Sequence, residues 1–180
     1  MKVESTELDG VKVIEPRVFG DDRGFFLESY NARAFDAAGL TATFVQDNHS
    51  GSRRGVLRGL HYQVEHAQGK LVRVAVGEVF DVVVDLRRSS TTFGRSLGMT
   101  LSAQNRRMLW VPPGFAHGFL TTSDYAEFLY KTSDYWYPEH ERTLLWNDPA
   151  LGIAWPLSAA PILTPKDAAG TPLAQADVYA

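Results

Sequence analysis

The sequence of 180 residues contains no cysteine, which excludes several kinds of chemistry at once. Disulfide bonds, thiolate metal sites and a cysteine nucleophile cannot be built from it. No apolar run approaches the roughly 18 residues that cross a bilayer, so we expect no association with a membrane. The first ten residues are polar and lack the apolar stretch of a signal peptide, which favours a cytoplasmic protein.

Neither sign of charge dominates the sequence. Lysine and arginine together number 18 and the acidic residues 21, which leaves a net charge of −3. Without a basic excess we expect no nucleic-acid partner, although one or two arginines could still hold a small anion. The sequence also lacks a glycine-rich phosphate loop of the Walker or dinucleotide-binding type. We therefore expect neither a nicotinamide step nor any other cofactor.

The chain has the composition of an ordinary globular protein, with 44% hydrophobic and 22% charged residues. Its length suits one domain over residues 1–180, and we find no repeat or linker that would divide it. From about residue 148 onward, prolines recur at intervals and the apolar patterning weakens. We expect residues 148–180 to form a tail that wraps over the core in loops and a short turn or helix.

Most of the chain reads as short strands separated by turn residues, which predicts an all-β sandwich, barrel or jelly roll. The expected strands are Leu71–Val76, Val79–Leu86, Ser96–Leu101, Arg107–Val111, Gly118–Thr122 and Ala126–Thr132. One helix is expected over Asn31–Gly39, with Asn31 as its cap and Gly39 as its end. Gly77 is expected to form a tight hairpin corner between two of the strands.

The segment Gly55–Gln63 (GVLRGLHYQ) places Arg58 and His61 in an otherwise apolar strand. Taken alone, such a histidine is more often a packed core residue than a catalyst. Residues three apart on a regular strand point to opposite faces of the sheet. If both serve one site, the strand must bulge or twist near Gly59.

Three further residues have side chains capable of acid–base or electrostatic chemistry. Lys70 opens an apolar strand, where it points either to solvent or into a cavity. His117 follows a rigid proline-glycine turn, and Tyr130 lies in the run Phe128–Lys131, where a core aromatic with a hydrated hydroxyl is the alternative interpretation.

A metal site is the competing interpretation of the histidines. The spacing Pro112-x-Gly114-x-x-His117 resembles the second motif of cupin-type jelly rolls, whose first motif supplies a His-x-His pair. Here the corresponding residues end in Gln63 instead of a second histidine. His61 with His66 offers too few ligands for a stable site, so we expect no metal. A metal-dependent cupin enzyme is kept as an alternative.

Eight motifs, in order along the chain, resemble the dTDP-4-dehydrorhamnose 3,5-epimerase family. The resemblance as a whole runs from about Arg23 to Asp167, and the eight motifs together are far more specific than any one of them. The motifs are Phe44–Ser50, Gly55–Gln63, Gly69–Val72, Gly77–Asp85, Thr92–Gly94, Pro113–Phe119, Trp146–Pro149 and Lys166–Asp167.

The resemblance implies a cupin-type double-sheet jelly roll with short peripheral helices. It implies a homodimer in which the two subunits help to build each other's sites. The implied reaction converts dTDP-4-keto-6-deoxy-D-glucose to dTDP-4-keto-L-rhamnose, on the way to dTDP-L-rhamnose. No redox cofactor is implied, because the inversion proceeds by proton exchange.

The resemblance also implies roles for individual residues. His61 matches the catalytic base and Tyr130 the acid, Asp167 pairs with the histidine, and Lys70 faces the ketone oxygen. Inversion beside a ketone requires these groups: a base, an acid on the opposite face and a positive charge at the developing enolate. The implied substrate contacts are Arg23 and Arg58 at the diphosphate and sugar, Phe26, Glu28, Gln46 and Asn48 at the nucleotide and sugar, His117 in a supporting or contacting role, and Trp136 on the thymine.

Two further alternatives stay open at this point. An enzyme of the same family that inverts only C3 or only C5 would share the catalytic residues. A catalytically silent module that binds sugar nucleotides would be expected to lack the base or the acid, whereas both are present here.

Overall fold

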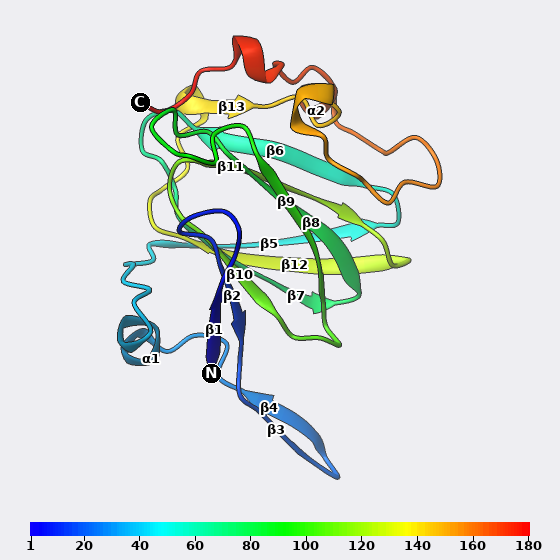
Figure 1. The fold of residues 1–180 in the computed structure, drawn as a ribbon. Helices are drawn as coiled ribbons and strands as arrows, with labels where there is room; N and C mark the ends of the chain where they lie inside the picture. The colour runs from blue at the N-terminus through cyan, green and yellow to red at the C-terminus, as the bar shows by residue number, and fades with distance from the viewer.

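Two facing β-sheets form the body of the molecule in the computed structural model, which describes residues 1–180 (Figure 1). The first sheet has six strands and the second has five. Every pairing within them is antiparallel. The prediction of an all-β double-sheet jelly roll is confirmed. None of the helices combines the length and apolar character that a membrane crossing requires.

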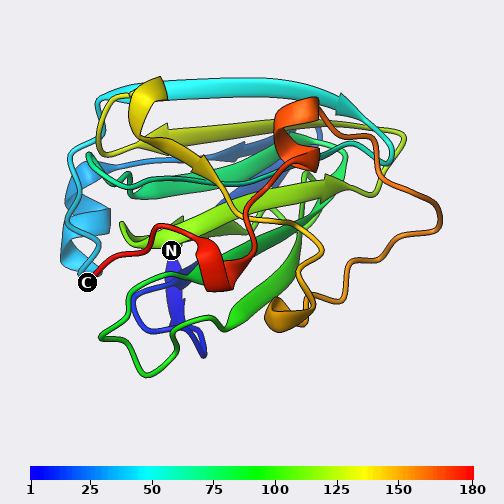
Figure 2. The same cartoon turned by 90° about the horizontal axis from the view of Figure 1, so that it is seen from above.

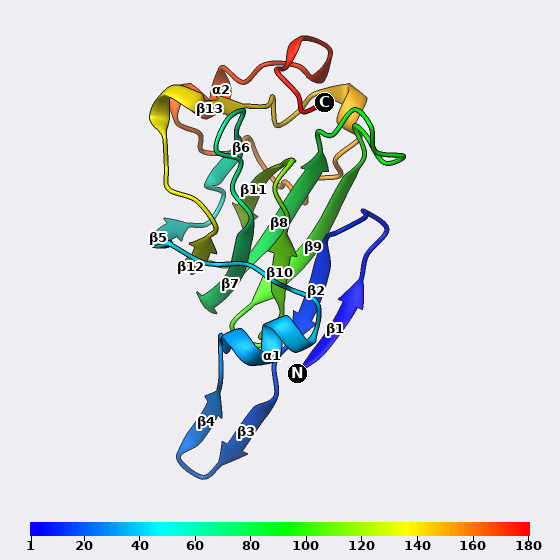
Figure 3. The same ribbon diagram turned by 90° about the vertical axis from the view of Figure 1, so that its left-hand side faces the viewer.

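The strands are mostly four to eight residues long. In spatial order, the first sheet comprises β1 (Lys2–Ser5), β2 (Lys12–Glu15), β10 (Met108–Val111), β7 (Lys70–Val76), β12 (Tyr125–Thr132) and β5 (Gln46–Arg53). The second comprises, again in spatial order, β13 (Glu141–Thr143), β6 (Leu57–Gln63), β11 (Phe115–Thr121), β8 (Glu78–Asp85) and β9 (Ser96–Ser102). A separate hairpin of β3 (Val18–Asp21) and β4 (Gly24–Leu27) projects beyond the sheets (Figure 3).

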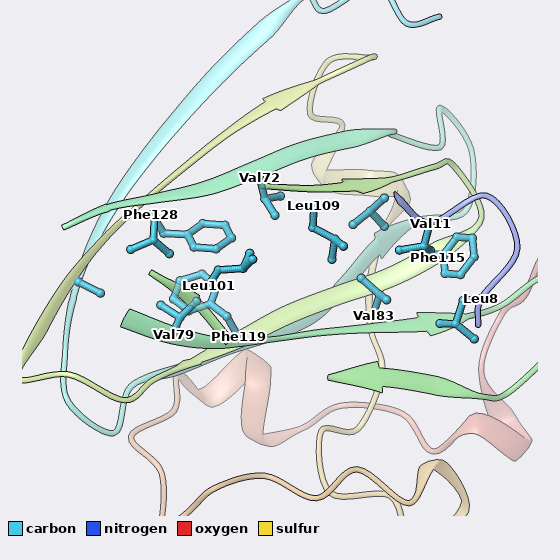
Figure 4. Packing of buried hydrophobic residues seen from close by; sticks show 13 residues of the cluster. Leu8, Val11, Val72, Val79, Val83, Leu101, Leu109, Phe115, Phe119 and Phe128 are labelled. Carbon is cyan, nitrogen blue, oxygen red and sulfur yellow. The ribbon is translucent and has the colours of Figure 1, made fainter. Parts of the chain in front are cut away.

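The main core fills the space between the sheets with 13 buried side chains (Figure 4). Val72 and Phe128 come from the first sheet, and Val83 and Phe119 from the second. The rings of Phe119 and Phe128 stack with centroids 4.2 Å apart. Phe119 and Phe128 also line the cavity that holds His61 and Tyr130, so this aromatic pair separates the apolar core from the polar side chains between the sheets.

The C-terminal segment covers the outer face of the second sheet (Figure 2). It contains no strand and is built from loops with η2 (Pro149–Leu151), α2 (Pro165–Ala168) and η3 (Leu173–Gln175). Trp155 and Tyr179 pack on the cluster that includes Val82 and Val84. Strand β8 is therefore buried on both faces, which explains why Val82–Val84 is a continuous apolar run.

The predicted helix is confirmed as α1 (Ala32–Ala37). The Asn31 side chain accepts a hydrogen bond from the Ala34 N–H, as a helix cap does. Gly39, two residues beyond the helix, has a φ of +75°. Phe35 is buried against Ile14 and Met108, which places α1 over the outer face of the first sheet.

The turn at Gly77 differs from the predicted hairpin. Strands β7 and β8 on either side of it belong to different sheets and do not pair with each other. The φ of Gly77 is +72°, and a Cβ atom there would lie 2.0 Å from the carbonyl oxygen of Tyr125. A corner between two sheets gives the same turn signal as a hairpin, so the sequence did not distinguish them.

The predicted irregularity at Gly59 is confirmed. His117 pairs with His61 and Phe119 pairs with Arg58, so two residues of β6 oppose the single residue Gly118 of β11. Gly59 adopts a φ of +113° at this bulge. Arg58 and His61 consequently face the same space despite their odd spacing.

We expect Gly59→Ala to lower the free energy of unfolding by about 3 kcal/mol or more, because it combines backbone strain with a steric clash. A Cβ atom would lie 2.7 Å from both the Gly118 Cα and the His117 carbonyl oxygen. Gly39→Ala is a matched control, since its φ is also positive but the added Cβ atom has no neighbour within 4 Å. Urea unfolding measures both variants, and equal losses would contradict the role assigned to the close approach of β6 and β11.

Candidate active site

A cavity of about 500 Å³ opens between the two sheets, next to the apolar core. Strands β5, β7 and β12 of the first sheet and β6 and β11 of the second supply most of its walls. It brings together all but three of the predicted site residues. The nine that line it are Gln46, Asn48, Arg58, His61, Lys70, His117, Tyr130, Trp136 and Asp167. Arg23, Phe26 and Glu28 lie elsewhere.

His61 and Asp167 form a hydrogen-bonded pair at the cavity wall. The distance from His61 Nε2 to Asp167 Oδ1 is 2.5 Å, and Asp167 is 2% exposed. Burial alone would raise the pKa of Asp167, but its hydrogen bonds to His61 and Thr164 hold that pKa below the ordinary value. An ionised Asp167 accepts from Nε2–H, so Nδ1 of His61 is the ring nitrogen left to accept a proton.

Thr164 orients the carboxylate and was not predicted. Its hydroxyl donates to Asp167 Oδ2 at 2.8 Å, and the Asp167 N–H donates back to Thr164 Oγ1 at 3.2 Å. This reciprocal arrangement caps α2. The sequence Thr164-Pro-Lys-Asp167 contains the spacing of a capping box, with Asp in place of the usual Glu or Gln, and this was the available signal.

Thr164→Val is expected to lower kcat about tenfold, since an outer hydrogen bond that orients an acid–base pair is lost. The unfolding free energy should fall by about 1.5–3 kcal/mol, the usual contribution of a hydrogen bond to a charged group. Steady-state kinetics and urea unfolding test both effects. Thr171→Val, at an exposed threonine outside the cavity, should change neither.

Lys70 is the buried cation of the cavity. It is 8% exposed, and burial lowers its pKa to about 8 despite the opposing charges of Glu141 and Asp81. Its Nζ lies 3.4 Å from the carbonyl oxygen of His61. The lysine that could have pointed to solvent therefore points inward, where it can stabilise a negative oxygen.

Tyr130 lies on the wall opposite His61, since β12 and β6 belong to facing sheets. Burial and the charge of Glu141 raise its pKa above the ordinary value, while Arg58 opposes the shift. The phenol is therefore protonated at neutral pH, the state required of a proton donor.

A second histidine–aspartate pair lies beside the first. His117 is the strand partner of His61, and its Nε2 lies 2.9 Å from Oδ2 of the fully buried Asp81. Asp81 was not predicted as a site residue, because its position in the run Val79–Leu86 indicated only a strand. No group of three or more histidine, aspartate or glutamate side chains is arranged to hold a metal ion. His66, the second histidine considered as a metal ligand, pairs with Asp134 and does not line the cavity.

Several polar side chains line the remainder of the cavity. Arg58 is held by Ser52 Oγ at 3.0 Å from its Nε and by the Gly51 carbonyl oxygen at 3.2 Å. The Gln46 amide donates to Asn48 Oδ1 at 2.9 Å. Gln68, Glu141 and Thr164 line the cavity although they lie outside the eight family motifs. Lys166, which belongs to the last motif, pairs with Glu141 at the rim.

Arg23, Phe26 and Glu28 do not contribute to this cavity. Arg23 and Phe26 belong to the projecting β3–β4 hairpin, where Arg23 pairs with Asp21 and is largely exposed. Glu28 follows β4 and accepts from the Asn31 side chain at 3.1 Å.

A family model described as dTDP-4-dehydrorhamnose 3,5-epimerase matches residues 5–175. The chain belongs to this family. The dTDP-4-dehydrorhamnose 3,5-epimerase of Pseudomonas aeruginosa is 62% identical over 180 residues, with 99% of each chain covered.

Solved structures of related epimerases have the same fold. The dTDP-6-deoxy-D-glucose-3,5-epimerase of Legionella pneumophila Philadelphia 1, in complex with dTDP-4-keto-L-rhamnose, superposes with a TM-score of 0.94 at 51% identity. The match covers 97% of this chain and 93% of that one. A 3'-monoepimerase from Streptomyces bikiniensis in complex with dTDP-quinovose gives a TM-score of 0.89 at 33% identity, covering 94% and 86% of the two chains.

Proposed function

We propose that the protein is a dTDP-4-dehydrorhamnose 3,5-epimerase, which converts dTDP-4-keto-6-deoxy-D-glucose to dTDP-4-keto-L-rhamnose. The observation that carries this proposal is the placement of a histidine–aspartate pair and a protonated tyrosine on opposite walls of one cavity. A buried lysine shares that cavity. Proton removal from one face of a carbon and proton return to the other is what inverts it.

In the proposed mechanism His61 Nδ1 removes the proton from C3. The electron pair of the broken C–H bond moves onto the C4 oxygen, which becomes an enolate beside the Lys70 ammonium. The Tyr130 hydroxyl then delivers its proton to C3 from the opposite face. Proton exchange with water returns the imidazolium and the phenolate to their starting states, and the same cycle at C5 completes the double inversion.

The three predicted residues outside the cavity support a homodimer as part of this proposal. The β3–β4 hairpin that carries Arg23 projects away from its own subunit (Figure 3). Its side chains Phe19, Phe25 and Phe26 are 49%, 62% and 65% exposed, a large apolar surface for a two-stranded hairpin. A second subunit that covers this hairpin would bury the aromatic rings and receive Arg23 and Phe26 next to its own cavity.

The test is proton NMR of dTDP-4-keto-6-deoxyglucose incubated with the enzyme in deuterated water. Deuterium should replace the protons at both C3 and C5, because the tyrosine proton exchanges with solvent before it is delivered. Exchange at one carbon alone would instead identify a single-position epimerase, the activity named for the Streptomyces bikiniensis relative. If neither C3 nor C5 exchanges its proton, the protein is not an epimerase acting on this substrate.

A further inference from the structure

Trp136 lies at the rim of the cavity on a loop, and little holds its side chain. It is 56% exposed, and its indole N–H donates no hydrogen bond within the chain. A ring that is more than half exposed and makes no hydrogen bond of its own is placed mainly by its backbone. The atoms that fix the backbone of residues 135–137 therefore decide where a planar ligand group can stack.

One buried amide fixes the peptide groups on both sides of Trp136. Gln63 is 3% exposed at the end of β6. Its Oε1 accepts from the Tyr137 N–H at 2.8 Å, and its Nε2 donates to the Tyr135 carbonyl oxygen at 3.2 Å. The other Nε2 proton goes to the carbonyl oxygen of His66 at 2.7 Å. A residue with only donors or only acceptors cannot make this set of bonds.

Other contacts connect the same loop to the neighbouring segment 64–69. The Gln68 side chain donates to the Asp134 carbonyl oxygen at 2.9 Å, and the ring of Tyr137 stacks on His66 at 4.1 Å. The Trp136 N–H itself donates to Gln46 Oε1 at 3.2 Å. Gln63 is the element of this network that reaches both sides of Trp136, yet it does not line the cavity.

We infer that Gln63 is a positioning residue for the nucleobase, acting through the backbone of Trp136. This inference rests on the proposed function, in which Trp136 stacks on the thymine of the substrate. Gln63 occupies the sequence position where a cupin of the metal-binding type has its second histidine. Its side chain here orders a loop that would receive a planar, uncharged base. The consequence is an effect on nucleotide affinity that is separate from the proton-transfer step.

The experiment compares Gln63→Leu, Gln63→Glu, Trp136→Ala and the double variant Gln63→Leu/Trp136→Ala in the full-length protein. Calorimetry gives the Kd for dTDP, and the deuterium assay gives kcat and KM. Trp136→Ala should weaken dTDP binding about tenfold, within the range for loss of one base–aromatic stack. Gln63→Leu should weaken it about five- to tenfold, with kcat within about twofold of wild type. Gln63→Glu keeps the acceptor but lacks the donors, so we expect a similar loss.

The double variant provides the decisive comparison. If Gln63 acts through Trp136, the double variant should bind dTDP within about twofold of Trp136→Ala alone, since coupled positions are not additive. Additive losses, or a fall in kcat at unchanged Kd, would overturn the inference. Gln104→Leu, at an exposed turn glutamine without side-chain hydrogen bonds, is the matched control.

Failure of the underlying function gives a different result. If wild type exchanges deuterium but Trp136→Ala binds dTDP normally, the stacking role and with it this inference are wrong while the epimerase activity stands. If Trp136→Ala weakens binding and neither Gln63 variant does, only the positioning role of Gln63 is wrong. Thermal unfolding of each variant identifies a loss of fold, in which case Gln63→Glu replaces Gln63→Leu in the double variant.

Discussion

His61→Gln is expected to lower kcat by about 10³- to 10⁴-fold, the upper range for loss of a positioned base. The glutamine amide can still donate to Asp167, as Nε2 of the histidine does at 2.5 Å. It has no basic nitrogen to take the place of Nδ1, so carbon deprotonation loses its acceptor. Proton NMR of the reaction in deuterated water, recorded at successive times, measures the effect. Exchange at C3 and at C5 should be lost together.

His140→Gln is the matched control for this substitution. His140 lies outside the cavity and its nearest acidic partner, Glu65, is 3.8 Å away. It should retain wild-type turnover. A His61→Gln enzyme that lost exchange at one carbon only would show that C3 and C5 have different bases, which contradicts the single-base mechanism proposed above.

Lys70→Met is expected to lower kcat/KM by about 10²- to 10³-fold, the usual loss when one preorganised group at a developing oxyanion is removed. The charge of Lys70 should also be visible in the pH dependence of kcat/KM for the wild type. Because the pKa of Lys70 is lowered to about 8, its ammonium form is lost as the pH rises through that value. The kcat/KM of the wild type should therefore fall above about pH 8, and the residual activity of the variant should lack this limb.

The same substitution should act in the opposite direction on stability. A lysine whose pKa falls on folding is destabilising while protonated, so stability rises as the pH increases from about 8 toward the unfolded value of 10.5. Lys70→Met removes the buried charge and should raise the urea midpoint at neutral pH. A variant that lost both activity and stability would indicate that Lys70 holds the cavity together instead of serving the reaction.

The sequence predicted the chemistry of the site better than its full extent. His61, Lys70 and Tyr130 lie in strands whose apolar neighbours made a polar side chain conspicuous. The odd spacing of Arg58 and His61 even required the bulge that Gly59 provides. Family motifs then supplied Asp167, which no periodicity could have brought to His61 from 106 residues away.

Residues such as Glu141 could not have been found in this way. Glu141 begins the three-residue strand β13, which is too short to show an alternation of apolar and polar residues. It reaches the cavity wall because β13 pairs with β6. Strand β5 was missed for a related reason: its sequence from Gln46 to Arg53 is polar, and most of its side chains line the cavity or are exposed to solvent. The alternation of apolar and polar residues reveals a strand when one of its faces is buried in an apolar core. Strands β5 and β13 have few buried side chains.

The location of Asp167 in the tail sets the order in which the site can be completed. Both sheets consist of residues up to Thr143, whereas the carboxylate that orients His61 follows 24 residues later. A growing chain on the ribosome could therefore assemble its whole sandwich and still have an unoriented imidazole. Activity would arise only once α2 has been made and docks on β6, and proteolytic removal of α2 would leave His61 without its carboxylate.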